Sequence, residues 1–502
     1  MPPKVPTKEV VKEMSDHFGF ELSEGEVVEY QSLIEASMQA YKVLDQYDDV
    51  RLPVKYPRKD VGYRPTGDEN PSNGWVWKCE IEGAQGGILQ GKKIGIKDNI
   101  MVAGVPMLNG SSIMEGFVPI EDATVVTRLL DAGATIAGKT GVPAFCFDGG
   151  GCTGYPDPQP ENPHDSTRMA GSSSNGSAVV VVTGQADMAI GGDQGGSVRL
   201  PASWSGCFGL KPTKGLVPYT GAFPIEQTID HLGPMANSAF DCGLLLQVIA
   251  GTDDMDPRQR DVTVKDYVSD IDKPIDGLRI GVVKEGFAIE GLSEDDVDAA
   301  VHDAALAFKK LGAQVETVSI PMHSHGQAIW AAVATEGATD LMIEGGAYGS
   351  NWMGHYSTSL MNFYSVARKQ KGKDYSETVK LTAMTGHYMS KNYNRHYYAK
   401  AQNLARVLSS QYDDALKKFD ILVMPTTPMK AQQKPASQSP SEIVAKALGN
   451  IYNTSPFNLT GHPAISVPVS NDSGLPIGMM LIGRHWEDDV VLKAAHQFES
   501  KG

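Results

Sequence analysis

Residues 170–213 read AGSSSNGSAVVVVTGQADMAIGGDQGGSVRLPASWSGCFGLKPT, and this stretch decides how the chain folds and where its chemistry lies. It contains two clusters of glycine and serine, at residues 171–177 and 191–197, on either side of the apolar run 178–182. Glycine allows backbone N–H groups to approach a substrate closely, and serine supplies a hydroxyl nucleophile or a proton relay. Together the clusters predict an acyl-transfer site with an oxyanion hole of main-chain amides.

A second candidate segment lies upstream, where residues 92–99 read KKIGIKDN. This pattern predicts a short strand over residues 93–97 and a polar turn after it, with Lys97 at the end of the strand. A lysine acts as a general base only if its pKa falls well below the reference of about 10.4, and burial among apolar groups lowers it. Contact with Asp98 would raise that pKa, so we expect Asp98 to point away.

These segments resemble the amidase signature family, whose members hydrolyse amide bonds with a Ser–Ser–Lys triad. The resemblance spans about residues 75–500, and further matching segments lie at residues 195–202 (GGSVRLPA), 209–213 (GLKPT), 424–426 (MPT), 460–464 (TGHPA) and 474–478 (GLPIG). Residues 193–197 and 216–232 are similar to the amidases that accompany nitrile hydratase in actinobacteria. Those enzymes also carry an extra helical segment before the core.

The resemblance implies a role for each matching residue. Ser197 would be the nucleophile, Ser173 the relay after a cis peptide bond at Ser172, and Lys97 the base. The backbone N–H groups of Gln194, Gly195, Gly196 and Ser197 would form the oxyanion hole. Three serines in a row, residues 172–174, leave the relay ambiguous by one position. No metal or cofactor is expected, and Arg199 is expected to bind a carboxylate such as that of Asp193.

The residues that would bind substrate are also taken from the resemblance. The candidates are aromatic and aliphatic, namely Phe147, Ile229, Trp330 and Ile451. For Trp330 and Ile451, simple packing in the core is an equally open interpretation. An apolar pocket with few polar groups suits aryl or alkyl amides.

Two nucleotide-binding patterns also occur in the sequence. Residues 133–140 match G-x-x-x-x-G-K-T, but that loop requires a strand before its first glycine and a helix after its threonine. Here we expect a helix over 124–132 and a strand over 135–137, between the glycines. Residues 149–154 match G-x-G-x-x-G, but the prolines that follow disfavour a helix that would receive a pyrophosphate. We expect this second loop to border the substrate pocket.

Composition excludes several classes of partner. The 502 residues carry a net charge of −16, which repels nucleic-acid phosphates and anionic membranes. Five cysteines, an odd number, with no C-x-x-C pair indicate a reduced, cytoplasmic compartment. The histidines show no spacing typical of a zinc site, and no run reaches the ~18 apolar residues of a membrane span.

The chain is expected to divide into an N-terminal helical segment and linker, residues 1–74, and a catalytic domain, residues 75–502. Alternating elements predict an α/β fold in which helices flank a mixed, mostly parallel central sheet. Strands are predicted over residues 93–97, 135–137, 188–191, 278–283, 421–424, 464–468 and 478–482, and helices over residues 124–132, 239–250, 295–311 and 399–419. The run AVVVV at 178–182 has strand propensity, but the resemblance implies a helix there, which we adopt.

The sequence therefore predicts an amide hydrolase that acts on small aliphatic or aromatic amides, with anilides and carbamates as further candidates. An alternative is the glutaminase subunit of a tRNA-dependent amidotransferase, which would have partner subunits. A nucleotide-binding ATPase, based on residues 133–140, is the alternative from another class. Nucleic acid and membranes are not expected as partners. The apolar faces of the N-terminal helices must be buried, against the main domain or in a homodimer.

Overall fold

The computed structural model describes residues 3–469 and 474–501. The chain forms two compact units, Met1–Arg51 and Leu52–Gly502, which are described separately. Within the described residues, every helix is too short or too polar to cross a lipid bilayer. All five cysteines are free thiols.

The N-terminal unit consists of the helices α1 (Lys8–Phe18), α2 (Glu24–Ser37) and α3 (Gln39–Leu44). Ser23 and Glu26 form a capping box, with the Glu26 carboxylate 2.8 Å from the Ser23 amide. The helical periodicity after this box continues to Leu44, but the structure divides it at Met38 into two helices. Several large apolar side chains of this unit, such as Phe18 and Leu33, are exposed.

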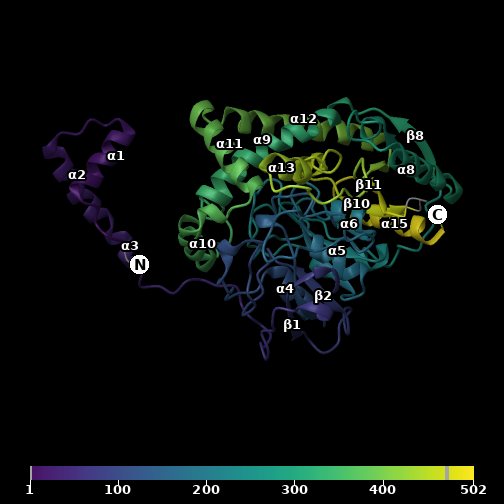
Figure 1. Ribbon diagram of the computed structural model, residues 1–502, viewed down its shortest axis with the longest axis horizontal. Coiled ribbons are helices and arrows are strands. Elements are labelled where there is room, and N and C mark those ends of the chain that lie inside the picture. The colour runs from purple at the N-terminus through teal and green to yellow at the C-terminus, as the bar shows by residue number, and fades with distance from the viewer. Residues whose placement is uncertain (1–2, 470–473, 502) are drawn as a thin grey trace. The chain divides into compact units, whose positions relative to one another are not determined.

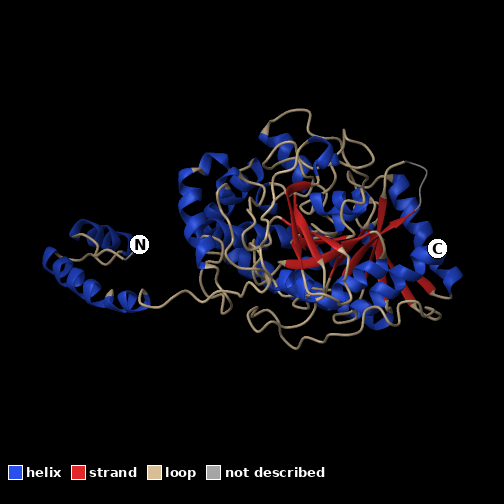
Figure 2. Cartoon of the chain, turned by 90° about the horizontal axis from the view of Figure 1, so that it is seen from below, coloured by secondary structure: helices blue, strands red, loops and turns tan. Residues whose placement is uncertain are grey.

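The larger unit is built on one eleven-stranded sheet, drawn in red in Figure 2. Its strands are β1 (Trp75–Glu82), β2 (Lys93–Lys97), β3 (Thr135–Thr140), β4 (Met188–Asp193), β5 (Phe208–Lys211), β6 (His231–Ala236), β7 (Arg279–Val283), β8 (Gln314–Val318), β9 (Ile421–Pro425), β10 (Ala464–Val469) and β11 (Ile477–Ile482). Their order across the sheet is β1-β3-β2-β4-β6-β5-β10-β11-β9-β7-β8.

The fold class is confirmed: the sheet is mixed and helices flank it. The parallel pairs are β2–β3, β2–β4, β7–β8 and β7–β9. The antiparallel pairs are β1–β3, β4–β6, β5–β6, β5–β10, β10–β11 and β9–β11. Among the described strands four pairs are parallel and six are antiparallel, so the parallel share is smaller than the sequence predicted.

Helices cover both faces of the sheet. Along β9 and β11, successive apolar residues alternate between two core clusters, as expected for side chains on opposite faces of a strand. One cluster includes residues of α4 (Thr124–Asp131), α7 (Ala239–Ile249), α8 (Asp295–Ala307) and α15 (Asp488–Lys501). The other includes residues of α9 (Gly326–Ala338), α10 (Thr358–Gln370), α11 (Glu377–Tyr393), α12 (His396–Lys418) and α14 (Pro456–Thr460). Figure 1 shows α9, α11 and α12 lying together over one side.

The valine-rich run forms the helix α5 (Asn175–Val182), as the resemblance implied. Residues 178–181 are fully buried, and α5 packs against β2, β4 and β6. A helix that is apolar all round is stable when it is enclosed on every side, so tertiary packing overrides the strand propensity of valine. The strands β1, β5, β6 and β8 were not predicted; β6 contains Gly233 and Pro234, which disfavour a strand locally.

Candidate active site

Lys97 lies at the end of β2 with its side chain fully buried. Its amine donates hydrogen bonds to Ser173 Oγ at 2.7 Å and to the Gly192 carbonyl at 2.8 Å. Burial disfavours the charged form and lowers the pKa of Lys97 below its usual value, although nearby Cys146 and Asp193 oppose this shift. The Lys97 amine therefore loses its proton more readily than an exposed lysine does.

The neighbouring Asp98 points away from that amine, as expected. Its carboxylate binds Lys139 Nζ at 2.8 Å and accepts hydrogen bonds from the amides of Leu108 and Asn109, both at 2.9 Å. Both side chains of the Asp98–Lys139 pair are fully buried. Lys139 is the lysine of the G-x-x-x-x-G-K-T match at residues 133–140. It lies within β3, after the strand segment predicted over residues 135–137. Because its ammonium binds Asp98, this lysine is not available for a phosphate.

The serine loop approaches Lys97 through a single hydroxyl. The Ser172–Ser173 peptide bond is cis, as the resemblance implied. Ser172 Oγ donates to the Asp148 carbonyl and Ser174 Oγ donates to the Gly192 carbonyl, whereas Ser173 Oγ contacts Lys97. The Ser174 amide also donates to the Ser197 carbonyl at 3.0 Å, so the two glycine–serine clusters lie side by side.

The second cluster forms a tight turn between β4 and α6 (Arg199–Ser205). Within this turn the Gly196 amide donates to Asp193 Oδ1 at 2.7 Å. Gly196 has φ +134°, and a Cβ there would lie 2.2 Å from Thr454 Oγ1, so the turn requires glycine. In the described part of the chain, the amides of Gln194, Gly195 and Ser197 donate no hydrogen bond. Ser197 is 8% exposed, and its hydroxyl has no hydrogen-bond partner among residues 3–469 and 474–501.

A buried ion pair holds this turn in place. Arg199 Nη2 and Nε each lie 3.0 Å from an Asp193 carboxylate oxygen, which confirms the expected pairing. Asn458 of α14 contacts both groups, donating to Asp193 Oδ1 at 2.9 Å and accepting from Arg199 Nη2 at 2.8 Å. Burial opposes ionisation, but the Arg199 guanidinium holds the pKa of Asp193 well below its usual range. The turn before Ser197 is therefore anchored by a charged, fully bonded network.

A small cavity of about 30 Å³ opens beside Ser197. Its described lining residues are Cys146, Phe147, Asp148, Gly149, Gln194, Gly195, Ser197, Ile225, Trp330, Leu448 and Ile451. Three of the four predicted pocket residues, Phe147, Trp330 and Ile451, are therefore in the lining. Ile229 is not: it is fully buried in the core, and its carbonyl accepts a hydrogen bond from His231 Nδ1. Ile225 occupies the wall in its place, four residues earlier in the same loop.

The loop of residues 149–154 borders the cavity at Gly149, as expected. The Asp148 carboxylate accepts hydrogen bonds from the amides of Gly150, Gly151, Cys152 and Thr153, at 2.7–2.9 Å. These N–H groups are the donors that a dinucleotide phosphate would need. The geometry thus excludes a phosphate-binding role for this loop.

Comparison with known proteins agrees with the geometry. A family model described as Amidase matches residues 77–492. An enantioselective amidase of Rhodococcus rhodochrous is 42% identical over 499 residues, covering 98% of this chain and 95% of that protein. The chain belongs to the Amidase family. This amidase is accordingly an enzyme that hydrolyses carbon–nitrogen bonds in amides.

Two solved structures show the same fold. A glutamyl-tRNA(Gln) amidotransferase subunit from Thermotoga maritima has a TM-score of 0.71 and 29% identity, over 86% of this chain and 88% of that chain. The peptide amidase of Stenotrophomonas maltophilia has a TM-score of 0.67 and 29% identity, over 83% of each chain.

Sequence reasoning missed several residues of the amidase site. Asn458 precedes the matching segment 460–464 but carried no signal of its contact with Asp193. Tyr219 was also missed; its hydroxyl accepts from Gln194 Nε2 at 3.0 Å and donates to the Phe223 carbonyl at 3.1 Å. Trp330 was predicted only as a pocket wall, yet its indole also donates to the Gln194 carbonyl at 2.6 Å. These contacts position the turn that carries Ser197.

Proposed function

We propose that Lys97, Ser173 and Ser197 form the catalytic triad of this amidase, with Lys97 as the base, Ser173 as the relay and Ser197 as the nucleophile. The observation that carries the proposal is the position of the buried Lys97 amine, whose Nζ lies 2.7 Å from Ser173 Oγ, within hydrogen-bond reach. A serine hydroxyl is a weak nucleophile at neutral pH and needs a base within hydrogen-bond reach. The desolvated amine supplies such a base.

The reaction follows from this order of groups. For this reaction the Ser197 hydroxyl, which makes no hydrogen bond in the described part of the chain, has to turn and donate to Ser173 Oγ. Ser197 Oγ then attacks the amide carbonyl carbon, and its proton passes to Ser173 while the Ser173 proton passes to Lys97. The ammonium then returns a proton through Ser173 to the leaving nitrogen, the C–N bond breaks, and ammonia or an amine departs. Water attacks the acyl-enzyme by the same relay and releases the carboxylic acid and Ser197.

For the oxyanion hole we propose the amides of Gln194, Gly195 and Ser197. The Gly196 amide also belongs to this turn, but its hydrogen bond to Asp193 Oδ1 at 2.7 Å supports a structural role for it. Each preorganised amide donor contributes ~3–4 kcal/mol to stabilising the tetrahedral intermediate in comparable sites. The Asp193–Arg199–Asn458 network supports this preorganisation because it holds both ends of the turn.

The proposed substrates are small amides with an aliphatic or aromatic acyl group, with anilides and carbamates as further candidates. Phe147, Ile225, Trp330 and Ile451 give the cavity apolar walls, which favour an apolar acyl group. Among the described lining residues the one charged side chain is Asp148, and backbone amides occupy its carboxylate. Because ion pairing of a substrate carboxylate needs a cation, this lining favours an uncharged acyl group.

The glutaminase subunit of a tRNA-dependent amidotransferase is the second candidate, favoured by the likeness to the Thermotoga maritima protein. Glutamine carries an α-carboxylate and an α-ammonium, and the described cavity lining offers no cation for the carboxylate. The match to the Rhodococcus amidase also extends over 98% of the chain, against 86% for the Thermotoga maritima structure. Both observations support the stand-alone amidase.

The proposal is tested with a panel of aliphatic amides, aromatic amides, anilides, carbamates and glutamine, using wild type and Ser197→Ala. The expected result is hydrolysis of apolar amides by wild type, with release of ammonia or amine, and none by Ser197→Ala. Glutamine turnover that exceeds turnover of every apolar amide would favour the glutaminase instead. Full activity of Ser197→Ala would contradict the triad.

We also propose that the protein is a cytoplasmic homodimer that binds neither nucleic acid nor membranes. Exposed apolar side chains on the N-terminal unit, including Phe18, Phe20, Leu33 and Tyr41, support an interface between copies. The five free thiols support a reducing compartment, and the net charge of −16 disfavours polyanions. Light scattering of the full-length chain measures the oligomeric state.

A further inference from the structure

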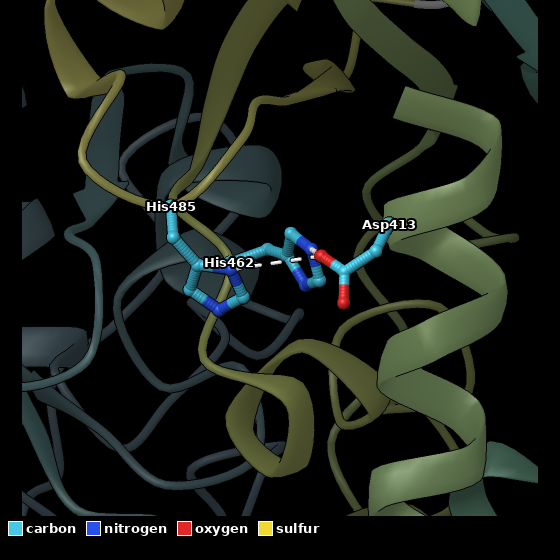
Figure 3. Close-up of side chains that lie close together, drawn as sticks. All are labelled: Asp413, His462 and His485. Atoms are coloured by element: carbon cyan, nitrogen blue, oxygen red, sulfur yellow. Dashed lines mark hydrogen bonds and ion pairs between the residues drawn. The ribbon is translucent and has the colours of Figure 1, made fainter. Parts of the chain in front are cut away.

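Three side chains from separate segments of the larger unit lie close together. Asp413 lies on α12, His462 lies between α14 and β10, and His485 lies between β11 and α15. Figure 3 shows the two imidazole rings lying against each other and Asp413 facing them. His462 Nε2 is 3.1 Å and His485 Nδ1 3.8 Å from Asp413 Oδ1. One potential ligand atom from each residue lies within 4.8 Å of the other two.

The hydrogen bonds of His485 determine where its lone pair points. Its Nε2 lies 2.9 Å from the Thr460 carbonyl oxygen, which can only accept, so Nε2 carries the hydrogen. In the neutral ring Nδ1 therefore presents a lone pair toward the Asp413 carboxylate. At 3.8 Å this pair of atoms is too far apart for a hydrogen bond. Two electron-pair donors thus face each other, and a cation between them would satisfy both.

His462 can become the third ligand of such a cation if its ring proton moves from one nitrogen to the other. Its Nδ1 is 3.0 Å from Thr460 Oγ1 and its Nε2 3.1 Å from Asp413 Oδ1. Without a metal ion, Nε2 can donate to Asp413 while Thr460 donates to Nδ1. With a metal ion, the ring proton moves to Nδ1 and is donated to Thr460 Oγ1, so that Nε2 becomes a ligand with no net proton released. A ligating histidine commonly donates its other ring N–H in this way.

Solvent can reach two of the three side chains of this cluster. Asp413 is half exposed and His485 about one-third exposed, so an ion can enter from solvent and keep water ligands. Bonds of about 2.0–2.2 Å to a shared ion require these two partly exposed side chains to move closer to His462 and to each other.

We propose that the Asp413–His462–His485 cluster binds one divalent transition-metal ion of the Zn²⁺, Co²⁺ or Ni²⁺ class. Two imidazoles and one carboxylate suit these ions better than Mg²⁺ or Ca²⁺, which prefer all-oxygen sites. The ion links α12 to the segment before β10 and the segment after β11. Its role is structural, because none of the three residues contacts the proposed triad. It stabilises the end of α14, the helix that also carries Asn458 of the Asp193 network.

The test uses the full-length protein after chelation and removal of the chelator. Co²⁺ is titrated in by absorption spectroscopy and Zn²⁺ by calorimetry at pH 7.5. Asp413→Asn and His485→Gln remove single ligands at partly exposed positions. Matched controls are Asp414→Asn, the exposed neighbour that pairs with Lys417, and His302→Gln, an exposed histidine on α8. Thermal unfolding without metal checks that each variant folds.

We expect wild type and both controls to bind one equivalent of Co²⁺, with imidazole-type spectra and unfolding midpoints that rise with metal concentration. Asp413→Asn and His485→Gln should lose more affinity than the about 10- to 100-fold caused by loss of an outer hydrogen-bond partner. Amide hydrolysis should persist in the metal-free protein. The proposal is overturned if wild type shows no saturable binding, or if both ligand variants bind Co²⁺ as wild type does.

Discussion

Replacement of Lys97 by methionine tests the proposed base most directly. Methionine is unbranched and only one atom shorter than lysine, so it fills most of the buried space. It removes the amine, which makes two hydrogen bonds, to Ser173 Oγ and to the Gly192 carbonyl. Removal of a general base lowers the rate about 10²–10⁴-fold, which corresponds to ~2.7–5.4 kcal/mol of transition-state stabilisation. We therefore expect kcat/KM of Lys97→Met to fall by at least two orders of magnitude.

The same substitution should change folding stability little at neutral pH but alter its pH dependence. Two lost hydrogen bonds destabilise the protein by ~1 kcal/mol each, and removal of a desolvated amine offsets part of this. Because burial lowers the pKa of Lys97, the unfolded chain holds a proton that the folded chain lacks between that lowered pKa and about 10.4. Stability of wild type should therefore rise with pH across this window, and this contribution should be absent from Lys97→Met.

The assay compares kcat/KM over pH 5–10 and urea unfolding at the same pH values for wild type, Lys97→Met and Lys93→Met. Lys93 is an exposed lysine on the same strand, so it controls for the loss of one lysine. Activity of wild type should increase with pH and reach its plateau well below the ordinary lysine pKa. Normal activity of a folded Lys97→Met at pH 7 would refute the assignment of the base.

Three further predictions follow from the same geometry. A sulfonyl fluoride or organophosphonate should add its mass to the peptide containing Ser197 in wild type and to no peptide in Ser197→Ala. Full inactivation with the label on another residue would contradict the assignment of Ser197 as the nucleophile. Asp193→Asn should lower the free energy of unfolding by ~3–5 kcal/mol, because it leaves the buried Arg199 guanidinium without its anion. The control Asp165→Asn, in a partly exposed ion pair, should change the free energy of unfolding by less than ~1 kcal/mol. Equal effects of the two variants in denaturant titrations would show that the buried ion pair stabilises the protein no more than the exposed one. Ile451→Trp should narrow the cavity beside Ser197 and raise KM for aryl amides more than for acetamide-sized substrates. Equal changes in KM would place the acyl group elsewhere.

Local pattern predicted many elements of the fold. The strand β2 and the helices α4 and α7 appear where the sequence pattern indicated them. Patterns of this kind depend on neighbours within a turn or a strand, so they can be read without knowing the rest of the structure. Strands such as β8, at the edge of the sheet with mostly exposed or half-buried residues, carry no such apolar pattern.

The sequence by itself determined the family and the order along the chain of the three segments that carry Lys97, Ser173 and Ser197. Tertiary structure alone decided which atoms come into contact. Asn458 binds Asp193, which lies 265 positions earlier in the chain. Asp413, His462 and His485 lie on three separate segments and come together only in the folded protein. It also decided that Ile225, rather than Ile229, lines the cavity. The physical reason is that periodicity reports whether a side chain is buried, whereas its partners depend on strand order and helix packing, which join residues far apart along the chain.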